Sequence, residues 1–119
     1  MIQVNSMIDE RPWGNYEVLL DDAHTKVKKI TVKPNQKLSY QYHYKRSEHW
    51  VIIEGIATII LNGLTITKHP GDSIFIPVET KHRIINEHSF LNLVFVEVQV
   101  GTYFGEDDIV RIEDDYNRT

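Results

Sequence analysis

The chain has 119 residues, a formal net charge of −4 and no cysteine, and its hydrophobic and charged fractions are those of a globular protein. This length suits one hydrophobic core, so we expect a single domain over 1–119, and without cysteine there are no disulfides and no thiolate metal sites. The mildly negative charge argues against general attraction to nucleic acid or to an anionic membrane surface.

The first residues show no basic segment followed by a long apolar run, so we expect no signal peptide. No apolar stretch approaches the ~20 residues that a membrane-spanning helix needs. We therefore expect a cytoplasmic protein that binds neither nucleic acid nor membranes.

Short β-branched and aromatic runs, separated by turn residues, follow one another along the chain. The predicted strands cover 26–33, 38–44, 50–53, 57–61, 64–67, 73–76, 81–85 and 91–100. Asn62-Gly63 is typical of a tight hairpin turn. No long window shows a helical period, so the pattern predicts an all-β sandwich or barrel. The acidic tail over 106–119 is expected to dock on it as a short helix or strand, with its last carboxylates in solvent.

Four side chains with nitrogen or oxygen donors stand out as metal-ligand candidates. Gln41 and His43 are two residues apart, which places both on one face of a strand. Glu48 follows a predicted turn, from which a returning strand can bring its carboxylate to the same face. His82 opens another apolar strand. Such a set, aimed into a closed barrel, suits one divalent ion with open coordination positions, and leaves Zn, Co, Mn, Fe, Ni and Mg open.

The spacing of these residues resembles the two sequence motifs of the cupins. The first motif, over 35–55, is carried by Asn35, Gln41, His43, Glu48 and Gly55. The second motif, over 71–86, is carried by Gly71, Pro77, Glu79, His82 and Asn86. Asn35 and Glu79 replace turn glycines, and Gln41 replaces the first histidine of most cupins. The resemblance implies a double-stranded β-helix, or jelly-roll barrel, and a homodimer.

The Gln-x-His form of the first motif is similar to the type II mannose-6-phosphate isomerases (phosphomannose isomerases), a domain found at the C-terminus of bifunctional mannose-1-phosphate guanylyltransferases. The matching segments are 11–14, 38–43, 46–50, 81–83 and 101–111. This resemblance implies a metal-dependent isomerase that interconverts mannose 6-phosphate and fructose 6-phosphate through an enediol, in GDP-mannose and polysaccharide biosynthesis.

Such a reaction needs a base that reaches two neighbouring carbons. Glu97 is the first candidate; it shares a face with Phe95 and Gln99, and parity alone does not say whether that face is interior. The plain alternative for Glu97 is a solvent-facing carboxylate on an edge strand. Lys45 has the parity of the predicted ligands, so it is a candidate to shuttle a proton or to hold an anionic oxygen.

The phosphate of a sugar-phosphate substrate needs cationic donors at the barrel mouth. Arg46, Arg83 and Arg11 are the candidates, although alternation turns Arg83 away from His82. Two other functions stay open: a non-catalytic sugar-binding or regulatory cupin, and an isomerase or epimerase of another activated sugar in surface polysaccharide synthesis. All four ligand positions are retained, which favours an enzyme, whereas the fold alone decides nothing.

Overall fold

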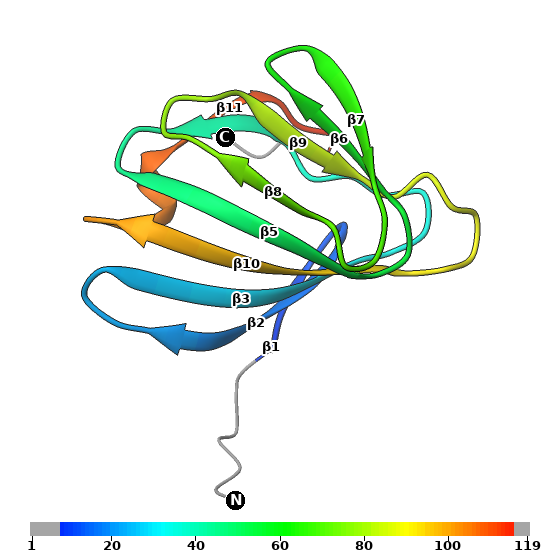
Figure 1. Ribbon diagram of the computed structural model, residues 1–119, viewed down its shortest axis with the longest axis horizontal. Helices are drawn as coiled ribbons and strands as arrows, with labels where there is room; N and C mark the ends of the chain where they lie inside the picture. The colour runs from blue at the N-terminus through cyan, green and yellow to red at the C-terminus, as the bar shows by residue number, and fades with distance from the viewer. Residues whose placement is uncertain (1–7, 116–119) are drawn as a thin grey trace, which may run out of the picture.

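The computed structural model describes residues 8–115, which form two antiparallel sheets and one short 3₁₀ helix (Figure 1). The first sheet has the order β1 (Ile8–Arg11), β2 (Gly14–Asp21), β3 (Thr25–Val32), β10 (Leu93–Gly101), β5 (Arg46–Glu54), β8 (Ser73–Ile76). The second has the order β11 (Ile109–Glu113), β4 (Tyr40–His43), β9 (His82–Ile85), β6 (Ala57–Leu61), β7 (Leu64–Lys68). The 3₁₀ helix η1 spans Glu106–Asp108.

The two sheets curl over a shared core, as the crossing strand order of a jelly roll requires. Alternation along each strand turns one set of side chains inward, and the buried cluster comes from both sheets. Its members are Trp13, Ile30, Val32, Trp50, Ile52, Ala57, Ile59, Ile76, Ile84, Leu93 and Phe95. The predicted all-β double-stranded β-helix is confirmed. No helix within residues 8–115 is long and apolar enough to cross a membrane.

The turns explain why the two motif glycines can be replaced. Asn35 and Glu79 have φ angles of 58° and 61°, the left-handed region that glycine adopts most easily. The predicted hairpin at Asn62-Gly63 joins β6 to β7, and φ is positive at both of its residues, as a type I′ turn requires. The motif spacing is therefore kept by backbone conformation even where the residue type differs.

Three strands differ from the sequence-based expectation. Strands β1 and β2 were not predicted. β1 is polar, whereas β2 contains the apolar run Val18-Leu19-Leu20, which the sequence analysis did not assign to a strand. The acidic tail forms η1 and β11, and β11 pairs with β4; residues 116–119 of that predicted tail lie outside the described residues. β5 begins at Arg46, where the polar run 45–47 predicted a turn. Because Arg46 then has the same parity as Glu48, its side chain points inward.

Asn86, the last residue of the second motif, ties the loop after β9 to the rest of the barrel. It is 1% exposed. Its Nδ2 donates to the carbonyl oxygens of Val32 at 3.0 Å and Leu91 at 2.8 Å, and its Oδ1 accepts from the backbone nitrogen of His88 at 3.1 Å. One side chain thus satisfies three backbone groups of neighbouring segments.

We expect Asn86→Ala to lower the free energy of unfolding by roughly 2–4 kcal/mol, because it strands backbone groups that are buried or half-buried. Urea unfolding measures this change. Asn92→Ala, which alters an exposed asparagine of the same loop, is the matched control and should cost little. Equal stability of the two variants would contradict the role given to Asn86.

Candidate metal centre and adjoining pocket

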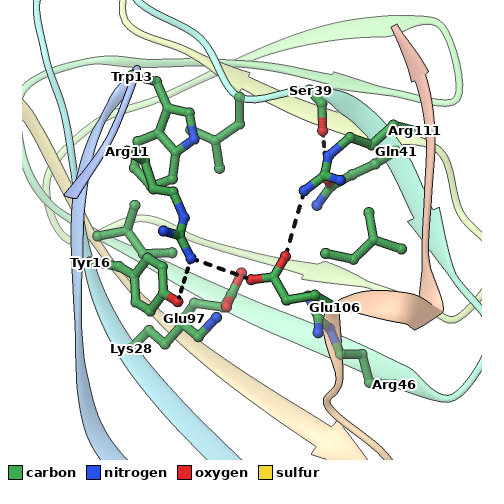
Figure 2. Close-up of a pocket in the computed structure, with 13 residues that line it drawn as sticks. Arg11, Trp13, Tyr16, Lys28, Ser39, Gln41, Arg46, Glu97, Glu106 and Arg111 are labelled. Carbon is green, nitrogen blue, oxygen red and sulfur yellow. Dashed lines mark hydrogen bonds and ion pairs between the residues drawn. The ribbon is translucent and has the colours of Figure 1, made fainter. Parts of the chain in front are cut away.

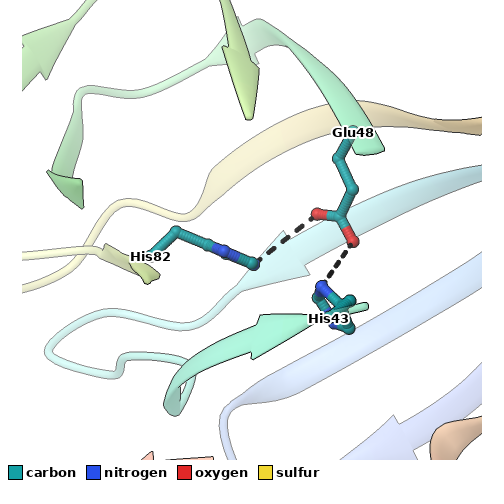
Figure 3. A group of neighbouring side chains, drawn as sticks. All are labelled: His43, Glu48 and His82. Atoms are coloured by element: carbon teal, nitrogen blue, oxygen red, sulfur yellow. Dashed lines mark ion pairs between the residues drawn. The ribbon is translucent and has the colours of Figure 1, made fainter. Parts of the chain in front are cut away.

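Three of the four predicted ligands converge inside the barrel (Figure 3). His43 ends β4, Glu48 lies in β5 and His82 begins β9, so both sheets contribute. His43 Nδ1 lies 3.7 Å from Glu48 Oε2, and His82 Nε2 lies 3.8 Å from Glu48 Oε1. All three side chains are buried, and their ligand atoms lie within 4.8 Å of one another. We call these three residues the His-Glu cluster.

Gln41, the fourth predicted ligand, lies at the edge of the His-Glu cluster. Its Nε2 is 3.5 Å from His43 Nε2, while its Oε1 accepts a hydrogen bond from the Ser39 hydroxyl at 2.6 Å. In this orientation the amide nitrogen, and not the oxygen, faces the cluster. Turning the amide over would exchange the two atoms, and the Ser39 hydroxyl could then accept from the nitrogen.

The state of His82 shows that the cluster fits a cation. Its Nδ1 donates to the carbonyl oxygen of Thr80 at 2.8 Å, which leaves Nε2 with its lone pair. That Nε2 has no hydrogen-bond partner among residues 8–115, and it faces a carboxylate oxygen. Burial lowers the pKa of His82 despite the nearby Glu48 charge, so the ring stays neutral. Two buried acceptors face each other, and a divalent ion between them would satisfy both.

Arg46 compensates the charge of Glu48. Arg46 Nε lies 2.9 Å from Glu48 Oε2, and Trp50 Nε1 donates to Glu48 Oε1 at 3.0 Å. Burial alone would raise the pKa of Glu48, but Arg46 and the two imidazoles hold it well below its usual range. Burial, assisted by Arg46, lowers the pKa of His43 to about 3. The carboxylate is therefore ionised and both rings are neutral, which are the forms that bind metals.

Arg46 does not lie where it was predicted. Its side chain is 5% exposed, and its Nη2 lies 2.9 Å from His43 Nε2. The sequence analysis placed it at the barrel mouth as a phosphate ligand, because the residues before Glu48 looked like a turn. The inward parity set by the early start of β5 puts the guanidinium against the cluster instead.

A pocket of about 490 Å³, counting its open part, adjoins the His-Glu cluster (Figure 2). Six of its thirteen lining residues are charged: Arg11, Lys28, Arg46, Arg111, Glu97 and Glu106. Gln41, Arg46 and Glu97 connect pocket and cluster, because each lines the pocket and interacts with His43 or Glu48.

Glu97 lies in this pocket and not on a solvent-facing edge. β10 is a central strand, paired with β3 and β5, and Glu97 is 6% exposed. Burial and the charge of Glu48 raise the pKa of Glu97 to about 8. Gln99, on the same face of β10, donates a hydrogen bond from Nε2 to Glu97 Oε1. The carboxyl group of Glu97 is thus buried, is positioned by Gln99, and has a pKa close to neutral pH.

Two predicted site residues lie away from the pocket. Lys45 sits in the turn between β4 and β5, where strand alternation stops; it is exposed, with its Nζ 5.1 Å from the centre of the Tyr103 ring. Arg83 faces away from His82, as alternation requires. Its Nε donates to the carbonyl oxygen of Leu38 at 2.7 Å, and it forms ion pairs with carboxylates of the tail. Neither position fits the role predicted for the residue.

Three charged pocket residues were missed by the sequence analysis: Lys28, Glu106 and Arg111. Lys28 had a signal, because it shares strand parity with the core residues Ile30 and Val32. Arg111 and Glu106 had none beyond their place in a segment of family resemblance. They enter the pocket only because η1 and β11 fold back across β4.

Comparisons with known proteins agree with this geometry. The model of the family "Mannose-6-phosphate isomerase C-terminal" matches residues 3–114. A mannose-1-phosphate guanylyltransferase of Salmonella montevideo is 44% identical over 108 residues, covering 91% of this chain and 23% of that protein. The alginate biosynthesis protein AlgA of Pseudomonas aeruginosa is 42% identical over 109 residues, covering 92% of this chain and 22% of that protein. The chain thus spans less than a quarter of the length of these curated relatives.

The fold also matches solved cupins. An RmlC-like cupin from Shewanella frigidimarina superposes with a TM-score of 0.74 at 17% identity, over 86% of this chain and 87% of that one. Identity at this level supports the fold alone, whereas the family match extends over nearly the whole chain and includes the His-Glu cluster. The chain therefore belongs to the mannose-6-phosphate isomerase C-terminal family, and its fold is that of the cupins.

Proposed function

We propose that the chain is a metal-dependent isomerase that interconverts mannose 6-phosphate and fructose 6-phosphate. The observation that carries the proposal is the buried, unpartnered Nε2 of His82, which faces the ionised Glu48 beside a pocket lined with cationic groups. Membership of the family supports the same reaction. The relatives' names, which refer to mannose 1-phosphate and to alginate, support a place in surface polysaccharide synthesis. The homodimer stays a prediction.

The reaction moves a carbonyl group between C1 and C2 of the sugar. His43, Glu48 and His82 would hold the ion, with Gln41 beside them. When bound, a divalent ion supplies positive charge that stabilises the negative charge developing on the sugar oxygens. The protein's own part is to exclude water, orient the sugar and carry the proton.

Glu97 is the group that we propose to carry that proton. In its ionised form it removes the proton from C2 of the aldose, and an enediol forms as O1 gains a proton. In its protonated form it returns the proton to C1 as O2 loses its own, so one proton moves between the carbons and one between the oxygens. Efficient general acid–base catalysis needs a pKa near the working pH, and the raised pKa of Glu97 meets this requirement. Gln99 positions the carboxyl group through its hydrogen bond.

Arg11 is the residue that we propose as a phosphate ligand, the role predicted from the sequence. Its guanidinium lines the pocket and donates a hydrogen bond from Nη2 to the Tyr16 hydroxyl at 3.1 Å. The Tyr16 ring also lies under the guanidinium, 5.2 Å from its centre. These contacts hold a fixed positive charge in the pocket, where it can bind the phosphate of a sugar phosphate.

A non-catalytic sugar-binding cupin is the second candidate function. The contact between Arg46 Nη2 and His43 Nε2 favours it, because this bond occupies a nitrogen lone pair that a metal would otherwise use. The two candidates differ in whether metal loading produces turnover.

The decisive assay couples fructose 6-phosphate formation from mannose 6-phosphate to a reporter enzyme. We expect chelated protein to be inactive and turnover to return when Zn, Co, Mn or Mg is added back one at a time. His82→Gln should lose bound metal and turnover together, because it removes one of three ligands. Elemental analysis of dialysed protein measures the metal.

His24→Gln, which changes an exposed histidine, is the matched control and should keep both metal and turnover. Full metal occupancy in His82→Gln would refute the site. Bound metal with no turnover on any of the four ions would refute the isomerase and favour the sugar-binding candidate.

Glu97→Gln should retain bound metal and lower turnover by roughly a hundred- to ten-thousand-fold, the usual contribution of a general base. Steady-state kinetics and elemental analysis give the two readouts. Glu54→Gln removes the same charge from an exposed carboxylate at the end of β5 and should behave as the wild type. Near-normal turnover in Glu97→Gln would mean that another group is the base.

The pKa of Glu97 also predicts a pH-dependent stability for the chelated protein. Its ordinary value of 4.5 applies to the unfolded chain and about 8 to the folded one, so the folded state binds more protons between these values. The stabilisation that Glu97 gives to the folded state is therefore lost as the pH rises from 4.5 toward about 8. Over this range the free energy of unfolding falls by at most about 1.4 kcal/mol per pH unit.

The lowered pKa values of His43 and His82 act in the opposite sense, but below their ordinary value of 6.5. The window from about 6.5 to 8 lies above the range in which these two histidines contribute. Across this window, urea unfolding should show that the free energy of unfolding declines less with pH for Glu97→Gln than for the wild type. Parallel curves would place the Glu97 carboxyl in an ordinary environment.

A further inference from the structure

The carboxylate of Glu106 lies between two guanidinium groups at the pocket (Figure 2). Glu106 Oε1 is 3.9 Å from Arg11 Nη2, and Glu106 Oε2 is 3.5 Å from Arg111 Nη2. Both separations are at or beyond the limit of a hydrogen bond, so attraction between charges dominates these contacts. The residues come from three elements, β1, η1 and β11.

We propose that Arg11 and Arg111 form an anion subsite for a phosphate group, and that Glu106 occupies it as an internal competitor which the phosphate displaces. That the phosphate belongs to a sugar rests on the proposed function. The subsite itself rests on the placement of these three side chains.

The two arginines are fixed, whereas Glu106 is free to leave. Arg11 ends β1 and is held by the hydroxyl and ring of Tyr16. Arg111 is 16% exposed and lies in β11, opposite Gln41 of β4. The Glu106 side chain is 56% exposed and belongs to a single 3₁₀ turn. It can rotate into solvent without breaking a strand.

Phosphate suits this subsite better than the carboxylate that holds it. A guanidinium binds phosphate oxygens through two parallel, charge-assisted hydrogen bonds, and a dianion can serve two guanidiniums at once. One carboxylate spans the same gap only at 3.5–3.9 Å. The Glu106 side chain is 56% exposed, and ion pairs with a solvent-exposed partner are weak, so an entering phosphate replaces Glu106 at little cost.

The subsite lies in the same pocket as the groups that adjoin the His-Glu cluster. Gln41, Arg46 and Glu97 line this pocket together with Arg11 and Arg111. A sugar phosphate anchored at the two arginines would therefore point its other end toward Glu97. Glu106 would offset the charge of the two arginines while the pocket is empty.

The test is calorimetric titration of inorganic phosphate into the full chain, in chelator so that no metal contributes. Glu106→Gln should bind phosphate roughly two- to tenfold more tightly than the wild type, because two weak ion pairs no longer compete. Arg111→Gln and Arg11→Gln should each bind it roughly tenfold more weakly or worse, because each loses charged hydrogen bonds. Glu106→Gln alters an exposed side chain, so it tests the proposal even if an arginine variant fails to fold.

Glu54→Gln and Lys29→Gln make the same charge changes at exposed positions outside the pocket and should leave phosphate affinity unchanged. Unchanged or weaker binding by Glu106→Gln, or equal shifts in its control, would overturn the proposal. Phosphate binding is measured independently of turnover. If the variants change phosphate affinity as expected but the protein has no isomerase activity, the proposed function is refuted and the anion subsite is retained. In an active protein, Arg111→Gln should raise KM for mannose 6-phosphate far more than it lowers kcat, and an unchanged KM would overturn the subsite.

Discussion

The buried carboxylate of Glu48 is the constraint on which the rest of the site depends. An ionised carboxylate at 1% exposure is tolerated only if its charge and its lone pairs are satisfied. Arg46 and Trp50 do this from the same strand, because all three have the same parity in β5 and point inward. His43 and His82 complete the ring from the opposite sheet. The inward face of β5 thus carries the charged centre and leads directly into the apolar core at Ile52.

A second carboxyl group in the same interior, that of Glu97, must then have a pKa different from that of Glu48. In the antiparallel register of β10 on β5, Gln99 lies opposite Glu48 and Glu97 opposite Trp50. Two neighbouring carboxylates cannot both ionise cheaply in a buried site, so compensation by Arg46 lowers the pKa of one while burial and repulsion raise that of the other. One group is left as a permanent anion suited to a cation, and the other as an exchangeable proton donor. This division follows from the strand register together with the compensating charge of Arg46.

Local sequence spacing predicts the parts of this arrangement that strand alternation and turn geometry determine. The common face of Gln41 and His43, and the left-handed turn at Asn35, follow from rules of that kind. Arg46 was misplaced because a polar run that begins a strand looks the same as one that forms a turn. Arg111 and Glu106 could not be predicted as neighbours of Arg11, because about a hundred residues separate them in sequence and only the pairing of β11 with β4 brings them together.

The two charged sites, around Glu48 and around Glu106, differ in burial, and this difference determines whether their ion pairs can open. The contact between Arg46 and Glu48, at 2.9 Å and nearly without exposure, is costly to break because either partner would be left as an unpaired buried charge. The contacts of Glu106 with Arg11 and Arg111 are longer, and the Glu106 side chain is 56% exposed, so water can solvate its carboxylate once it is released. The same residue types therefore organise the interior permanently and bind exchangeably at the pocket. A substrate whose phosphate binds where Glu106 can be displaced leaves the buried charges around the reacting carbons undisturbed. Fixed charges of this kind are the condition for preorganised catalysis.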